Sequence, residues 1–210
     1  MSQNNIPDHL KKRYHHVYSA FHLCNTSLTE TKILNLSDFN PKELELVNGH
    51  TFKYFRVTLQ YSYIMEYHNL LEKGRKNSSE HISSLVRLNE ALKNTLGPKF
   101  NDRYQENITL IEELKSSLYL KKLQDLRDKK FAHSEKNPIN EPFKIKGLNE
   151  GDISNGIEHL SIMREIIKNC TSPYGFDYKL ETPSSENRTL NFIKFQSKYK
   201  QFYFENQHIK

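Results

Sequence analysis

The chain has 210 residues, 36% of them hydrophobic, with seven glycines, seven prolines and a formal net charge of +6. This length suffices for one buried core, and the scarcity of glycine and proline argues against a turn-rich β-sandwich and against a disordered chain. The positive charge favours polyanionic partners such as nucleic acid, although many lysine-rich proteins are simply basic. The composition therefore predicts a helical protein.

The first helix is predicted to begin after Pro7 and to end near Cys24. Residues 25–39, rich in Ser, Thr and Asn, are expected to form a loop. A second helix is predicted over residues 41–73, and Gly49 is a point at which it can bend or divide. Residues 52–71 are apolar on most faces, which favours the centre of a bundle for this helix.

A third helix is predicted to be capped by Ser78 or Ser79 and to close near Gly97. The fourth is expected to cover residues 101–133, because Pro138 forbids its continuation. Its inward positions are predicted to be Tyr104, Ile108, Ile111, Leu114, Leu118, Leu123 and Leu126.

After a connecting loop over residues 138–150, Asp152 or Ser154 is expected to cap a fifth helix. The inward stripe of this helix is predicted to be Ile153, Ile157, Leu160, Met163 and Ile167. These helices predict an all-α, up-and-down bundle over residues 1–170, with residues 171–210 as a partly helical extension packed on the same domain.

The end of the extension is aromatic and basic. Phe192, Phe195, Tyr199 and Phe202 recur at three- and four-residue steps, which favours an amphipathic helix that docks on the bundle or across a dimer. Because lysines alternate with these rings, the alternative is a nucleic-acid surface that stacks bases and neutralises phosphates.

The strongest candidate chemistry lies at the end of the fourth predicted helix, in Arg127-Asp-Lys-Lys-Phe-Ala-His133. Histidine can transfer a proton near neutral pH, and a guanidinium matches a phosphate, so the pair suffices for metal-free RNA cleavage. The other interpretation is a solvated basic helix end, where a cation complements the macrodipole. Six residues along a straight helix separate Arg127 and His133 by about 9 Å and leave them about 120° apart. Either the arginine curls toward the histidine, or a second copy of the segment completes the site.

The segment Leu126 to Ser134 resembles the HEPN superfamily, whose helical bundles carry an Arg, four to six residues and then a His near a helix end. The order of predicted helices over roughly residues 45–170 resembles that superfamily as well. The resemblance implies a metal-independent endoribonuclease that acts as a homodimer, often as a toxin or in anti-phage defence. It implies that Arg127 and His133 are catalytic and that Asp128 orients one of them.

We accordingly predict RNA contacts from Lys129, Lys130 and Ser134, with RNA, a second copy and an antitoxin or other defence protein as partners. The alternative function is a non-catalytic HEPN-like module that binds RNA, a nucleotide or a partner protein through the same basic groove. No cofactor is expected. The histidines of the first helix, such as His9 and His16, lack the spacing of zinc ligands, so no metal site is predicted.

Cys24 and Cys170 have no CxxC spacing and are predicted to be buried thiols. The N-terminus lacks a basic region followed by an apolar stretch, and no apolar run approaches the ~18 residues of a membrane span. We expect a soluble, cytoplasmic protein without a membrane partner.

Overall fold

A computed structural model of the chain describes residues 6–72, 83–128, 147–175 and 185–207. The helices are α1 (Asp8–Leu36), α2 (Pro41–Val47), α3 (His50–Leu71), α4 (Leu85–Leu96), η2 (Gly97–Phe100), α5 (Asn101–Ser116), α6 (Leu118–Leu126), α7 (Glu150–Thr171), η4 (Ser172–Tyr174) and α8 (Ser185–Gln207). None of the described residues lies in a strand, and the predicted all-α bundle is confirmed.

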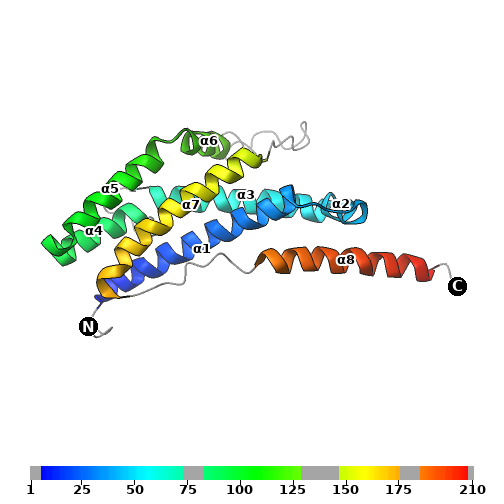
Figure 1. The fold of residues 1–210 in the computed structure, drawn as a ribbon, viewed down its shortest axis with the longest axis horizontal. Coiled ribbons are helices and arrows are strands. Elements are labelled where there is room, and N and C mark those ends of the chain that lie inside the picture. Colours follow the sequence, from blue (N-terminus) through cyan, green and yellow to red (C-terminus); the bar gives the residue numbers. More distant parts are fainter. Residues whose placement is uncertain (1–5, 73–82, 129–146, 176–184, 208–210) are drawn as a thin grey trace.

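The long helix α1 lies at the centre of the bundle. It packs against α3 along its length and also contacts α4, α7 and α8, while α5 packs against α4 and α7 (Figure 1). The core between these helices is made of large side chains that are almost fully buried, among them Leu10, Tyr14, Phe21, Leu28, Tyr63, Ile64, Tyr67, Leu88, Phe100, Leu114, Leu123 and Met163. Cys24 and Cys170 lie in this core as free, buried thiols, as predicted.

The prediction that the first helix ends near Cys24 is wrong, because α1 continues to Leu36 through the segment expected to be a loop. Leu28, Ile33 and Leu34 carry the buried stripe onward. The hydroxyl of Thr31 donates to the Ser27 carbonyl one turn earlier at 2.8 Å, so a polar side chain is buried inside the helix with its hydrogen bond made.

The second predicted helix divides at Gly49, which is the N-cap of α3. A Cβ atom at this position would lie 3.0 Å from the Leu46 carbonyl oxygen, so the tight junction between α2 and α3 favours glycine. The first half of α3 does not lie at the centre of the bundle as predicted, since Tyr54 is 71% and Phe55 50% exposed. Its second half does, through Tyr63 and Tyr67.

The fourth predicted helix is also divided, because Ser117 has extended backbone and separates α5 from α6. Its hydroxyl accepts the Leu120 N–H at 3.1 Å and so caps α6. The break rotates the helix face, and Leu118, expected to point inward, is 80% exposed.

Two other predicted caps are wrong as well. Ser84, and not Ser78 or Ser79, is the N-cap of α4. Asn149 begins α7 through a capping box with Asp152, one turn before the predicted start of that helix. On α7 the predicted inward residue Ile157 is 47% exposed.

A buried cluster of tyrosines joins α3, α6 and α7. The Tyr63 and Tyr119 hydroxyls lie 2.8 Å apart, and the Tyr67 hydroxyl is hydrogen-bonded to His159 Nδ1. Gly156 of α7 permits this close approach, because a Cβ atom there would lie 2.7 Å from the Tyr63 hydroxyl oxygen. The cluster fixes α6 against the bundle.

Within the described ranges, no helix combines the length and the apolar character that crossing a membrane requires.

Candidate active site at the end of α6

Arg127 lies at the point where α6 ends. The helix is amphipathic and anchored by Tyr119, Leu120 and Leu123 on its buried side. Lys122 forms an ion pair with Asp152 at the start of α7. The position of the last turn of α6 is therefore set by contacts with both α3 and α7.

Arg127 and Asp128 follow α6 with π-helical backbone, and the Arg127 N–H donates to the Leu123 and Gln124 carbonyls. Backbone of the π type occurs frequently at functional sites. His133, Lys129, Lys130 and Ser134 lie outside the described residues.

The Arg127 guanidinium is held between two carboxylates. Its Nε donates to Asp128 Oδ1 at 2.9 Å, and one terminal nitrogen donates to Glu72 Oε1 at 3.3 Å. The contact with Asp128, opposed by partial burial, raises the pKa of Arg127, so the group is a permanent cation. The contact between Asp128 and Arg127 is the geometry that an orienting role for Asp128 requires.

The two ion pairs of Arg127 are partly exposed to solvent. The side chains of Arg127, Glu72 and Asp128 are 30%, 43% and 63% exposed, respectively. Surface ion pairs of this kind contribute only about 0–1 kcal/mol each. A phosphate could therefore replace one carboxylate on Arg127 at a small energetic cost.

His68 places a second imidazole beside Arg127, although it is not among the site residues predicted from the sequence. It is 4% exposed, forms a hydrogen bond with the Leu123 backbone, and its Nε2 atom has no partner among the described residues. Burial and then the charge of Arg127 lower the pKa of His68, so the ring is neutral near pH 7. The sequence feature that could have indicated these two residues is their four-residue spacing at the end of α3, which places His68 and Glu72 on the same side of the helix.

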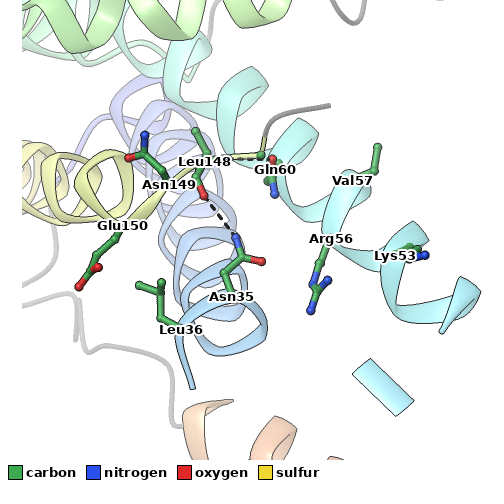
Figure 2. Close-up of a pocket in the computed structure, with 10 residues that line it drawn as sticks. Asn35, Leu36, Lys53, Arg56, Val57, Gln60, Leu148, Asn149 and Glu150 are labelled. Carbon is green, nitrogen blue, oxygen red and sulfur yellow. Dashed lines mark hydrogen bonds between the residues drawn. The ribbon is translucent and has the colours of Figure 1, made fainter. Parts of the chain in front are cut away.

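A separate cavity of about 540 Å³ lies between the end of α1, the first half of α3 and the start of α7. Figure 2 shows Asn35 donating to the Leu148 carbonyl, and the Leu148 N–H donates to Gln60 Oε1 at 3.3 Å. The Arg56 guanidinium donates to the Leu34 carbonyl at 2.8 Å, while its Nε has no partner among the described residues.

This cavity is separate from the end of α6, since positions 56 and 72 are about 24 Å apart at 1.5 Å per residue along the α3 axis. Its lining carries charges of both signs, from Lys53, Arg56 and Glu150, and so favours no single class of ligand. In the part of the chain that the structure describes, no three His, Cys, Asp or Glu side chains gather as metal ligands.

The model of the HEPN family described as AbiU2 matches residues 6–175 of the chain. No curated protein and no solved structure matches the chain. The matched range contains α1 to α7 and Arg127, and ends before α8. Since the model covers most of the chain, the protein belongs to the AbiU2 family of HEPN domains, an abortive-infection type of helical bundle.

Proposed function

We propose that the protein is a metal-independent endoribonuclease of HEPN type that acts as a toxin or an anti-phage defence effector. The observation that carries the proposal is the position of Arg127. Its guanidinium is permanently charged and held by two partly exposed carboxylates, at the end of a helix fixed to the bundle. The family membership supplies the context for this site.

In the proposed reaction the 2′-hydroxyl attacks the neighbouring phosphorus, the 2′-O–P bond forms and the P–O5′ bond breaks. His133 takes the hydroxyl proton while water protonates the leaving 5′-oxygen, or His133 protonates that oxygen while water takes the hydroxyl proton. Arg127, oriented by Asp128, stabilises the negative charge on the phosphoryl oxygens. Lys129, Lys130 and Ser134 contact the flanking backbone. The products carry a 2′,3′-cyclic phosphate and a 5′-hydroxyl.

Single-stranded or looped RNA is the proposed substrate, because in-line attack needs a flexible backbone and splayed bases. We propose a homodimer in which two copies of the segment share one cleft. An antitoxin or another defence protein would then regulate the enzyme by covering this cleft.

The test compares cleavage of a labelled single-stranded RNA in EDTA by the wild type, Arg127→Lys and His133→Asn. We expect each variant to lose about 10²- to 10⁴-fold in rate, because lysine lacks the planar guanidinium and asparagine cannot transfer the proton. Lys121→Ala, an exposed substitution on the same helix, is the control and should cleave at the wild-type rate. Equal cleavage by all four proteins would contradict the assignment.

A mixing experiment tests the composite cleft. If each site combines Arg127 of one chain with His133 of another, mixing the two inactive variants creates heterodimers with one intact site and restores part of the activity. If both residues of a site come from the same chain, the mixture stays inactive.

The second candidate is a non-catalytic module that binds RNA, a nucleotide or a partner protein. The pairing of Arg127 with Glu72 and Asp128 favours it, since a phosphate must displace a carboxylate before it can bind the guanidinium. RNA binding that survives His133→Asn, together with no cleavage by the wild type, would support this candidate.

A further inference from the structure

The C-terminal helix α8 lies outside the range matched by the family model, which ends at residue 175. It packs beside α1 and α2, and its ribbon runs on past the end of α2 (Figure 1). Ile193 anchors it in a small cluster with Leu34, Val47 and Phe52. The Thr189 hydroxyl donates to Glu30 on α1. The bundle therefore holds α8 along one side of the helix.

The face of α8 opposite this anchor carries exposed aromatic rings. Phe192, Phe195 and Tyr199 are 54%, 64% and 57% exposed, respectively. Their three- and four-residue steps place them on one stripe, about 145° around the helix from Ile193 and Ser197 on average. The prediction that Phe192, Phe195 and Tyr199 dock on the bundle is therefore wrong, because Ile193 and Ser197 make that contact. Docking across a dimer stays a prediction, and the side chain of Phe202 lies outside the described part of the chain.

Exposed cations accompany the rings. Arg188 lies one turn before Phe192 on the same stripe, and Lys194 and Lys198 form a parallel row. The sequence from position 188 to position 199 contains no aspartate or glutamate. We call the exposed side of α8 formed by Arg188, Phe192, Lys194, Phe195, Lys198 and Tyr199 the aromatic-basic face.

Charge decides which occupant this face fits. Two-fold pairing of α8 with a second copy would bring like-charged rows close together without a compensating carboxylate between positions 188 and 199. A single nucleic-acid strand instead supplies phosphates to the cations and flat bases to the rings. Duplex RNA is a poorer fit, because its bases are stacked within the helix and cannot lie on aromatic side chains.

We propose that the aromatic-basic face binds single-stranded RNA, as an addition to the domain that the family shares. This proposal rests on the proposed ribonuclease function for the identity of the substrate. Bases stack on Phe192, Phe195 and Tyr199, while Lys194 and Lys198 neutralise phosphates. The contact recognises no particular sequence, since every base presents a flat face.

The test measures binding of a fluorescent mixed-sequence single-stranded RNA to the full chain carrying His133→Ala, which prevents cleavage in the assay. The key variant adds Phe192→Leu, Phe195→Leu and Tyr199→Leu, which keep an apolar side chain but remove the rings. We expect affinity to fall about tenfold or more, because stacking on a protein ring stabilises each bound base. The matched control, Tyr54→Leu with Phe55→Leu, changes two exposed rings on α3 and should bind normally.

A second arm changes Lys194 and Lys198 to glutamine and measures binding against salt concentration. The slope of log affinity against log salt should fall by about 1.4, because two phosphate contacts to a single strand are lost. An unchanged slope, or unchanged affinity in the leucine variant, would overturn the proposal. Sedimentation of the same proteins tests whether the aromatic-basic face instead binds a second copy of the chain. If Phe195→Ser with Tyr199→Ser dissociates a dimer and leaves RNA affinity unchanged, the face binds a second copy and the proposal fails.

The outcomes separate this proposal from the ribonuclease itself. If the wild type cleaves RNA but RNA affinity does not depend on the three rings, the ribonuclease proposal stands and the proposed role of α8 is wrong. If RNA affinity depends on the rings but the wild type does not cleave RNA, the aromatic-basic face stands as an RNA-binding surface and the ribonuclease proposal is wrong.

Discussion

Two groups of aromatic side chains with the same helical spacing lie in opposite environments. Tyr63 and Tyr67 are four residues apart on α3 and fully buried. Phe195 and Tyr199 are four residues apart on α8 and more than half exposed. Four-residue spacing thus shows that two rings share a helix face, but not whether that face meets another part of the protein.

What differs is the surface opposite each face. The α3 tyrosines meet Tyr119 of α6 and His159 of α7, and their hydroxyls are hydrogen-bonded. Burial raises the pKa of Tyr63, so its hydroxyl stays protonated as a hydrogen-bonding group. On α8, Ile193 occupies the contact with the bundle and the rings point away from it. The first group stabilises the fold, and the second is available to a ligand.

The largest expected difference between the two groups is in stability. Tyr67→Ala should lower the free energy of unfolding by about 3–5 kcal/mol, because it leaves a large cavity and removes the partner of His159. Phe195→Ala should change it by no more than about 0.5 kcal/mol. Urea unfolding followed by circular dichroism measures both values. Similar losses in the two variants would mean that the α8 rings are buried in solution.

Gly156→Ala tests the close packing of the buried group. An added Cβ atom would lie 2.9 Å from the Tyr119 hydroxyl oxygen and 2.8 Å from Leu28 Cδ2. We expect a destabilisation of about 1–3 kcal/mol from overpacking, although alanine is the better helix former. Gly151→Ala in the same helix is the control, since its nearest neighbour would be Asn149 Oδ1 at 3.4 Å. Equal stability of the two variants would show that the cluster is looser than described.

The smallest expected effect is a pH dependence of stability. Burial lowers the pKa of His159 and of His68, so the unfolded chain binds more protons than the native one as the pH falls through about 6.5. The melting temperature should therefore decrease on acidification from neutral pH, and His159→Gln should make this decrease shallower. An identical profile for His159→Gln would mean that His159 is not buried in its neutral form.

Much of the fold could be predicted from the sequence, because apolar residues at helical spacing require burial wherever the helices pack. The errors arose where local chemistry competes with this pattern. Thr31 satisfies its hydroxyl within α1, so a polar segment continues the helix instead of forming a loop. Ser117 caps a new helix inside one continuous pattern and turns Leu118 to solvent. Hydrophobic periodicity alone reveals neither the continuation of α1 nor the break between α5 and α6.

Some residues of the candidate site could likewise be predicted from the sequence, and others could not. The Arg127 motif could be recognised because its residues are close in sequence and carry a definite chemistry. Glu72 and His68 could not, since they reach Arg127 only through the packing of α3 against α6. Pairing across helices depends on their register, which a single sequence does not reveal.

Cleavage by 2′-hydroxyl attack at the site of Arg127 and His133 is the central proposal for this protein. The most direct measurement maps one cleavage position in a labelled RNA in EDTA, then repeats the reaction with a single 2′-deoxy nucleotide on the 5′ side of that position. We predict that cleavage stops there and continues at other positions, because the nucleophile is removed only at the substituted sugar. Undiminished cleavage at the deoxy position would contradict the account.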